Sequence, residues 1–411
     1  MSSEVAEHRL ESICLMVVDC PHVTPKWTDS GVVVLRNQNI KAGRLDLTTP
    51  SFTDEEHFKG RTKRAVPTAG DIVITREAPM GDVCLIPEGL RCCLGQRQVL
   101  LRPNPQKVDA RFLLFALQSP YIQFQIGWNE GTGSTVSNLR IPVLESLKIP
   151  TPPMSRQVEI ATTLGALDDR ITLLRETNAT LEVIAQALFK SWFVDFDPVR
   201  AKMKGRPAEG MDEATAALFP DGLEESELGL VPRGWRVGTL QDLLLLQRGF
   251  DLPSDLRVLG DYPIIAASGP SGTHNAPMAK APGVVTGRSG VLGRVFLELD
   301  DYWPLNTTLW VKEFRAATPC YAYELLSLLD LKSFNAGSAV PTLNRNHIHG
   351  LTYLVPPGDC VAAYELIAIQ LHERARLNNE QAQTLATLRD TLLPRLISGQ
   401  LRLPGLDAAK G

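Results

Sequence analysis

The feature that most constrains this chain is an internal repeat. The segment GSTVSNLRIPVLESLKIPTPP, residues 133–153, returns as GSAVPTLNRNHIHGLTYLVPP, residues 337–357, at an ungapped offset of 204 residues. The match continues into the next segments, where 133–190 and 337–394 share 14 of 58 positions. Two copies at so long a period indicate duplication of a large folded unit, not a solenoid of short repeats.

The repeat also extends upstream. GDIVITREAPMGDVCLI begins at Gly70 and aligns with APGVVTGRSGVLGRVFL, which begins at Ala281, so that Arg76 lies opposite Arg288. Both halves carry short β-branched runs bounded by Gly, Pro and Asn, and such runs predict strands. The predicted strands are 31–35, 71–75, 97–101, 262–267, 283–287 and 307–311. One short helix is predicted in each half, at 110–120 and at 317–330.

A long helical pattern follows each Pro-Pro pair. From Ile160 to Leu188 the apolar residues recur at alternating steps of four and three, which is the heptad seam of a coiled coil. Part of this seam returns in 361–396, and a helix of about 35 residues is about 50 Å long. We expect the two helices to pack antiparallel, with Ser155 as the first N-cap. Asn178 on the seam either fixes the register or lies at a wet, frayed position.

Composition indicates a soluble globular protein, with 44% hydrophobic and 21% charged residues and a net charge of −4. The excess acid lies in 151–231, which holds 8 basic and 14 acidic residues, whereas 1–150 and 232–355 each carry +1. Charge alone therefore cannot give strong affinity for nucleic acid. The seven cysteines form no CxxC pair, and no targeting segment is visible, so we expect reduced thiols and a cytoplasmic location.

Catalytic motifs are missing from the sequence. It holds no GxxxxGK[ST] phosphate loop, no Asn-Pro-Pro-aromatic motif of amino-methyltransferases and no PD...[DE]xK nuclease pattern. His347 and His349 are a weak metal pair, better interpreted as surface or DNA-facing residues. Asp168 and Asp169 are better interpreted as a solvated helix face than as an acid/base pair. The glycines from Gly287 to Gly293 are typical of a hairpin, not of a nucleotide loop.

Three segments carry a family resemblance, and together with the repeat it spans nearly the whole chain. LGALDDRITLLRETNATLEVIAQALFKSWFVDFDPVRAK (164–202), GLVPRGWRVGTLQDL (229–243) and TLATLRDTLLPRLISGQL (384–401) resemble the specificity subunits of type I restriction–modification systems. The resemblance implies an α+β fold, in which two tandem pseudo-symmetric target-recognition domains are separated by two long antiparallel coiled-coil helices. We expect the first domain at 1–150, the spacer helix and linker at 151–231, the second domain at 232–355, and the second spacer helix and tail at 356–411.

The resemblance also implies a function. Such a subunit does not catalyse and binds no cofactor directly. It recognises double-stranded DNA and positions two modification subunits, which are methyltransferases that bind S-adenosylmethionine. It also positions the restriction subunits, which are Mg- and ATP-dependent nucleases. Because the two β-rich blocks differ in sequence, we expect an asymmetric, bipartite DNA site.

Readout of base edges requires polar side chains on loops or strand ends. In the first block the candidates are Arg36, Asn37, Asn39, Lys41, Arg44, Arg76, Ser134, Thr135, Asn138 and Arg140. In the second block they are Ser271, Thr273, His274, Arg288, Ser338, Thr342, Asn344, Arg345 and Asn346. Taken singly, each of these residues is better interpreted as an ordinary exposed loop residue, whereas the GS turns as a pair favour DNA contact because the polar cluster occurs twice at equivalent positions. A second hypothesis for the whole chain is a scaffold that bridges partner proteins through its helix pair without reading DNA sequence.

Overall fold

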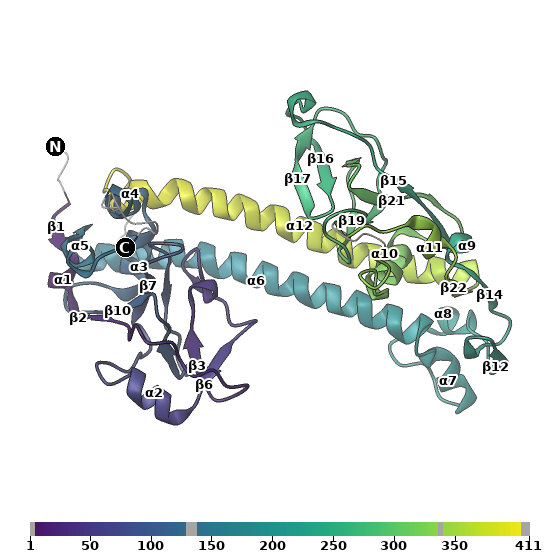
Figure 1. The fold of residues 1–411 in the computed structure, drawn as a ribbon, viewed down its shortest axis with the longest axis horizontal. Coiled ribbons are helices and arrows are strands. Elements are labelled where there is room, and N and C mark those ends of the chain that lie inside the picture. The colour runs from purple at the N-terminus through teal and green to yellow at the C-terminus, as the bar shows by residue number, and fades with distance from the viewer. Residues whose placement is uncertain (1–4, 129–137, 336–339, 404–411) are drawn as a thin grey trace, which may run out of the picture. The chain divides into compact units, whose positions relative to one another are not determined.

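The computed structural model describes residues 5–128, 138–335 and 340–403 (Figure 1). The chain divides into two compact units. Unit 1 comprises 1–174 and 380–411, and unit 2 comprises 175–379. Two 40-residue helices, α6 (Met154–Phe193) and α12 (Gly358–Ile397), each contribute one part to unit 1 and one part to unit 2. Among the described residues, no helix is long and apolar enough to span a membrane.

Unit 1 contains two small sheets and two strand pairs beside its part of the helix pair. The elements before α6 are β1 (Glu7–Arg9), α1 (Leu10–Ile13), β2 (Cys14–Asp19), β3 (Val32–Leu35), the 3-10 helix η1 (Asn37–Asn39), β4 (Ile40–Lys41), β5 (Arg44–Leu45), β6 (Ser51–Thr53), α2 (Glu55–Arg61), β7 (Ile72–Thr75), β8 (Val83–Leu85), β9 (Cys92–Leu94), β10 (Gln98–Pro103), α3 (Ala110–Gln118), α4 (Pro120–Trp128), α5 (Ile141–Ser146) and β11 (Lys148–Pro150). Its sheets have the orders β2-β10-β7-β8 and β6-β3-β9, and its strand pairs are β1-β11 and β4-β5.

Unit 2 repeats this plan after a short linker. Its elements are α7 (Asp197–Met203), α8 (Glu213–Ala217), β12 (Leu223–Ser226), β13 (Gly229–Pro232), β14 (Arg236–Thr239), α9 (Leu240–Leu243), β15 (Leu244–Arg248), η2 (Ser254–Leu256), β16 (Tyr262–Ala266), β17 (Gly269–His274), β18 (Gly283–Gly287), β19 (Val295–Glu298), β20 (Trp303–Pro304), β21 (Thr308–Phe314), α10 (Pro319–Leu328), α11 (Arg345–His349) and β22 (Thr352–Val355). Its sheets are β15-β21-β18-β19 and β17-β16-β20, and β14 pairs with β22.

The two larger sheets of each unit, and the pairs β1-β11 and β14-β22, match in strand order. Parallel pairing occurs at the same place in each, between β3 and β9 and between β16 and β20. The residues that follow β1 and β14 donate their backbone N–H to the same position of the repeat: Leu10 to Leu147 O and Leu240 to Leu351 O, both at 2.9 Å. The predicted strands and short helices are confirmed, and the 204-residue offset reflects a duplicated fold.

The predicted helix pair is also confirmed. In unit 1, Ile171 and Leu174 of α6 pack against Ala382 of α12 in a small apolar cluster. In unit 2, the Asn178 amide lies buried, donates to Ala375 O at 2.9 Å and accepts from the Asn378 amide at 2.8 Å. Asn178 therefore occupies the register-fixing position, not a wet one.

Each unit has its own core. The large cluster of unit 1 packs apolar residues of β7, β10 and α3 against Ile160 and Leu164 of α6. Unit 2 is more aromatic, and Phe189, Phe193, Tyr321 and Tyr364 contact one another edge-on or tilted with ring centroids 4.9–5.8 Å apart. These cores fix α6 and α12 to the sheets and hold the strand ends in place.

Three local predictions are wrong. Helix α6 begins at Met154, so Ser155 lies inside the helix and is not its N-cap. Asp168 is buried and bonded to Arg389 Nη1 at 2.6 Å and to Arg44 Nη2 at 3.3 Å, so it is not a solvated carboxylate. His349 is buried, and its Nε2 accepts the Leu246 N–H at 2.8 Å, so it is not a surface histidine.

Candidate nucleic-acid interface

Four chain segments meet beside the strand ends of unit 1. They are Asp19–His22 after β2, Arg36–Gln38 after β3, Arg76–Glu77 after β7 and Gln96–Arg97 before β10; we call them the first turn cluster. Backbone hydrogen bonds tie them together, from Cys20 N to Gln98 O at 3.1 Å and from Arg76 N to Arg97 O at 2.8 Å. The sheet thus brings residues that are far apart in sequence to one edge.

Side-chain contacts in this cluster centre on Arg76 and Glu77. Arg76 lies largely buried, with Nη1 at 2.7 and 2.8 Å from the two Asp19 carboxylate oxygens and Nε donating to Leu139 O at 3.0 Å. The Asn138 amide donates to the Glu77 carboxylate at 2.7 Å, and the Asn37 amide donates to the Glu77 carbonyl. Four of the candidates, Arg36, Asn37, Arg76 and Asn138, therefore lie in or beside one cluster, although Arg76 is committed to internal bonds.

Two hollows open on the first turn cluster. One, of about 420 Å³, is lined by Trp27, Arg36, Asn37, Gln38 and Arg97 among others. A smaller one of about 170 Å³ lies between His22, Arg76, Glu77, Gln96 and Arg97. The Arg36 guanidinium lies 5.3 Å from the centroid of the half-exposed Trp27 ring, a cation–π geometry. This is a polar, aromatic surface of the kind that contacts bases and phosphates.

Unit 2 has the equivalent cluster at the same strand ends. The second turn cluster comprises Arg248–Asp251 after β15, Ala266–Ser268 after β16, Arg288–Ser289 after β18 and Asn306–Thr307 before β21. Its backbone bonds are the same, from Gly249 N to Thr308 O at 3.1 Å and from Arg288 N to Thr307 O at 2.8 Å.

The repeated GS turn approaches both clusters in the same way. Leu139 N donates to Arg76 O at 2.9 Å, and Leu343 N, 204 residues later, donates to Arg288 O at 2.8 Å. Thr342 forms a β-bridge with Ser289, so it lies beside the second turn cluster. Ser134, Thr135 and Ser338 of these turns lie outside the described residues.

The other candidates lie elsewhere in their units. Asn39 is buried and caps its own turn by bonding Arg36 N and Asp46 O, each at 2.9 Å. Arg44 reaches back to Asp168 O on α6 at 2.7 Å, and Lys41 is exposed on the neighbouring β4. Arg140 and Asn344 precede α5 and α11, while Arg345 and Asn346 are exposed in α11.

The β17 candidates belong to the edge strand of the smaller sheet in unit 2. His274 is buried, accepts Val258 N–H at Nδ1 over 3.1 Å and stacks edge-on against Trp303. The Ser271 carbonyl accepts from Arg257 at 3.2 Å, and Thr273 pairs with Pro263 in the ladder. The DNA contacts of all these residues stay predictions.

Sequence reasoning missed several residues of the clusters. Trp27, Gln96 and Arg97 in unit 1 and Arg248 and Asn306 in unit 2 were not candidates. Alignment of the two repeats could have found them. The number of residues that separates β2 from β15 differs, however, from the number that separates β7 from β18, so a single ungapped alignment does not match both pairs. Only the backbone bonds make the equivalence of Asp19 and Arg248 visible.

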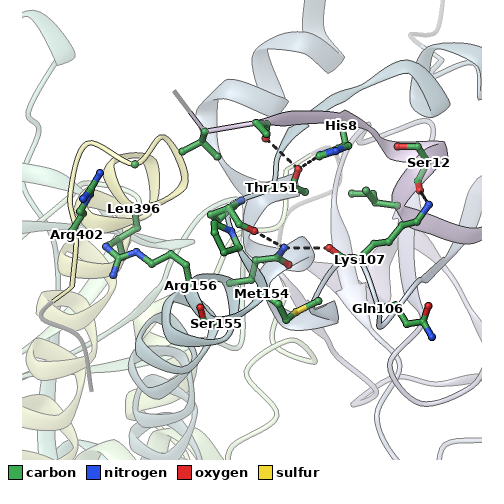
Figure 2. Close-up of a pocket in the computed structure, with 17 residues that line it drawn as sticks. His8, Ser12, Gln106, Lys107, Thr151, Met154, Ser155, Arg156, Leu396 and Arg402 are labelled. Carbon is green, nitrogen blue, oxygen red and sulfur yellow. Dashed lines mark hydrogen bonds between the residues drawn. The ribbon is translucent and has the colours of Figure 1, made fainter. Parts of the chain in front are cut away.

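A larger hollow of about 1060 Å³ lies in unit 1, away from the turn cluster (Figure 2). His8 and Thr151 are hydrogen-bonded to each other, the Lys107 ammonium donates to Ser12 O at 2.7 Å, and Arg156 pairs with Glu159 at 2.5 Å. These bonds join β1 to the residue after β11 and α1 to the segment before α3, and the Arg156–Glu159 pair lies within α6. Within the described ranges, no cluster of His, Cys, Asp or Glu has the geometry to hold a metal ion.

Comparison with known proteins bears on what the clusters recognise. Residues 27–183 match the family model described as type I restriction modification DNA specificity domain. The matched part of this chain is therefore similar to that domain. The matched residues include most of the first turn cluster and the part of α6 that follows it.

Relatives match over most of the chain. The chain is 24% identical to the type I restriction enzyme MjaIX specificity subunit of Methanocaldococcus jannaschii, over 94% of this chain and 88% of the relative. It is also 24% identical to the HindI specificity subunit of Haemophilus influenzae, over 85% and 90% of the two chains. These names confirm the resemblance to the specificity subunits of type I restriction enzymes.

A solved structure supports the fold. The type I restriction–modification S subunit from M. genitalium superposes with a TM-score of 0.60 at 17% identity, covering 97% of this chain and 96% of that one. The α+β architecture with two long helices packed together is therefore confirmed.

Proposed function

We propose that this chain is the specificity subunit of a type I restriction–modification complex and that it reads an asymmetric, bipartite DNA site. One observation carries the proposal: the two units share strand order and backbone hydrogen bonds but present different side chains at equivalent turns. Two copies of one frame with unlike surfaces suit two unlike half-sites, because half-site geometry follows protein pseudo-symmetry.

In this proposal the chain itself catalyses no reaction and holds no cofactor. It acts in the cytoplasm with two modification subunits, which supply S-adenosylmethionine-dependent methylation, and with ATP-dependent restriction subunits. Candidates beside each turn cluster, such as the exposed Arg36 in unit 1 and the half-buried Thr342 in unit 2, contact the DNA. The residues already committed to internal bonds, such as Asn39 and Arg76, hold the turns in shape.

The test is the target of the reconstituted complex. DNA methylated by the full complex is sequenced for modified bases, and a split target with two different half-sites is the expected result. The four segments of the first turn cluster are then exchanged for those of another specificity subunit, which is expected to change one half-site and leave the other. A contiguous target, or a change in both half-sites, contradicts the proposal.

The alternative is a scaffold that joins partner subunits through α6 and α12 and does not read sequence. It predicts that the assembled complex binds the methylated target and a scrambled duplex of equal length with the same affinity. Competition between these two duplexes at fixed salt separates the hypotheses, because specific complexes bind their site at least about a thousandfold more tightly.

A further inference from the structure

The two turn clusters differ in charge at equivalent positions. The backbone bonds that align Cys20 with Gly249 also align Asp19 with Arg248, because each immediately precedes the aligned residue. The strand registers agree, since Asp19 pairs with Val99 and Arg248 with Leu309, and these partners pair with Ile74 and Thr286 respectively. A carboxylate in unit 1 is thus replaced by a guanidinium in unit 2.

This replacement removes the acidic partner of the repeated arginine. In unit 1, Asp19 binds Arg76 Nη1 through both carboxylate oxygens. In the described part of unit 2, the Arg288 side chain is anchored through Nε, which donates to Asn306 O at 3.0 Å. Among the described residues of unit 2, no carboxylate forms an ion pair with Arg288, so its two terminal nitrogens remain available.

Neighbouring positions change in the same direction. Asp82, whose carbonyl accepts from Thr75 N, is replaced by Arg294, whose carbonyl accepts from Gly287 N. Arg294 donates to Ser268 O at 2.7 Å within the second turn cluster. Glu77, the acid at the centre of the first cluster, is replaced by Ser289.

The net charges of the clusters therefore differ. At matched positions unit 1 holds three arginines and three carboxylates: Arg36, Arg76, Arg97, Asp19, Glu77 and Asp82. Unit 2 holds three arginines and one carboxylate: Arg248, Arg288, Arg294 and Asp251. Asp251 lies 3.3 Å from Arg248 Nη2, but both side chains are more than half exposed, at 66% and 51%, and such a pair is weak.

We propose that Arg248 and Arg288 together bind one backbone phosphate of the DNA, so that unit 2 supplies a salt-dependent anchor that unit 1 lacks. The inference rests on the proposed function and names the chemistry of its second site. Arg248 ends β15 and Arg288 follows β18, the strands on either side of β21, at the positions where Asp19 and Arg76 contact each other in unit 1. The exposed Asp251 carboxylate offsets only one of the two guanidiniums, and a phosphate oxygen can neutralise the remaining positive charge by charge-assisted hydrogen bonds. In unit 1 the same position is already occupied by Asp19.

The experiment uses the full complex and the duplex that it methylates. Dissociation constants are measured from 50 to 200 mM salt for the wild type, Arg248→Gln, Arg288→Gln, the double variant and Arg248→Asp, which restores the residue type of unit 1. Arg233→Gln is the matched control, because Arg233 is an exposed arginine of unit 2 outside the cluster that pairs with Asp221 at 3.4 Å. Thermal unfolding verifies that every variant is folded.

Loss of one phosphate contact lowers the slope of log K against log salt by about 0.9. We expect this change for the double variant and for Arg248→Asp, so that their affinity falls about threefold less than that of the wild type between the two salt concentrations. The loss at low salt is expected to be equal for the target and for a scrambled duplex. Arg233→Gln is expected to match the wild type.

Two results overturn the inference while leaving the proposed function intact. One is an unchanged salt slope in the double variant of a complex that still prefers its target. The other is a loss confined to duplexes carrying one particular base pair, which indicates readout of a base edge by these arginines. Wild-type complex that binds target and scrambled duplex equally refutes the proposed function itself, whatever the variants do.

Discussion

The two turn clusters show how one backbone frame can carry different net charges. Both are closed by the same hydrogen bonds, yet an acid followed three residues later by His22 in unit 1 becomes an arginine followed three residues later by Asp251 in unit 2. Gln96 donates to His22 O, and the equivalent Asn306 donates to the Asp251 carboxylate. The frame depends on backbone bonds, so the side chains that face outward are free to diverge.

The largest difference in stability between the two units is expected on replacing Arg76 and its equivalent Arg288. Arg76→Gln leaves Asp19 without its cation in a site where the two side chains are only 10% and 20% exposed. Breaking such a pair costs about 3 kcal/mol of unfolding free energy. Arg288→Gln removes one bond to a carbonyl and costs less than about 1 kcal/mol.

Amide hydrogen exchange of the full chain measures both variants, because peptides from β7 and β10 report on unit 1 and peptides from β18 and β21 report on unit 2. We expect lost protection in unit 1 for Arg76→Gln and little change in unit 2 for Arg288→Gln. Equal destabilisation of the two units contradicts the assignment of different roles to the two arginines.

The second prediction concerns the helices α3 and α10, which occupy the same place in the two units. Six residues after the helix N-cap, unit 1 has Phe115 and unit 2 has Glu324, and both are buried. Burial raises the pKa of the Glu324 carboxyl to about 7, and the nearby Glu182 carboxylate adds to the rise. The folded state therefore holds this proton more tightly than the unfolded chain does.

The stabilisation from Glu324 is complete below its unfolded pKa of 4.5 and is lost as pH rises through about 7. Glu324→Gln keeps the shape of the protonated acid and does not titrate. The unfolding free energy of Glu324→Gln minus that of the wild type is expected to rise by about 3 kcal/mol from pH 5 to pH 8.

Urea unfolding, followed by the fluorescence of Trp192 and Trp235 in the core of unit 2, measures the difference. His372 lies 3.8 Å from Glu324, and burial lowers the pKa of its imidazole. In the wild type and in Glu324→Gln alike, this imidazole makes the unfolding free energy rise with pH, opposite to the effect of Glu324. Glu373→Gln, on the exposed side of α12, is the control. A difference that is constant with pH disproves a raised pKa for Glu324.

The strands and helices could be predicted from the sequence more fully than the side-chain contacts between distant residues. Short β-branched runs and the heptad seam are local signals, and the strands and both long helices follow them. The offset between Arg76 and Arg288 also predicted two residues that the structure places equivalently. The role of Asp168 depends on Arg44 and Arg389, and that of His349 on Leu246, and no local pattern indicates such distant partners.

The site was predicted only in part for the same reason. Arg36, Asn37 and Asn138 were found because they are polar residues in turns. Arg97 and Arg248 were missed because each lies at the end of an apolar strand, where only the sheet brings it beside the other segments. Insertions between the strands change the offset of the repeat, so the exchange of Asp19 for Arg248 is hidden in the sequence.

The third prediction compares the two parts of the helix seam. Asn178→Leu leaves the Asn378 amide buried without its partner and costs about 1–3 kcal/mol. Ile171→Val, in the apolar part within unit 1, costs about 1 kcal/mol. Replacing Asn178 and Asn378 together by leucine removes the unpaired amide, so the double variant is expected to recover stability and lose register specificity. Equal stability of the single and double variants, measured by urea unfolding, contradicts the coupling of these amides.

The smallest effect is expected at the N-caps of α3 and α10. The Asp109 carboxylate accepts the Phe112 N–H at 2.8 Å, whereas Thr318 makes no side-chain capping bond, and its buried hydroxyl has no partner among the described residues. Asp109→Ala therefore costs about 1 kcal/mol. Thr318→Ala removes only an unpaired hydroxyl and is expected to change stability by less than about 0.5 kcal/mol. Thermal unfolding of both variants measures the difference. A larger loss of stability for Thr318→Ala than for Asp109→Ala contradicts the prediction and shows that α10 depends on its N-cap more than α3 does.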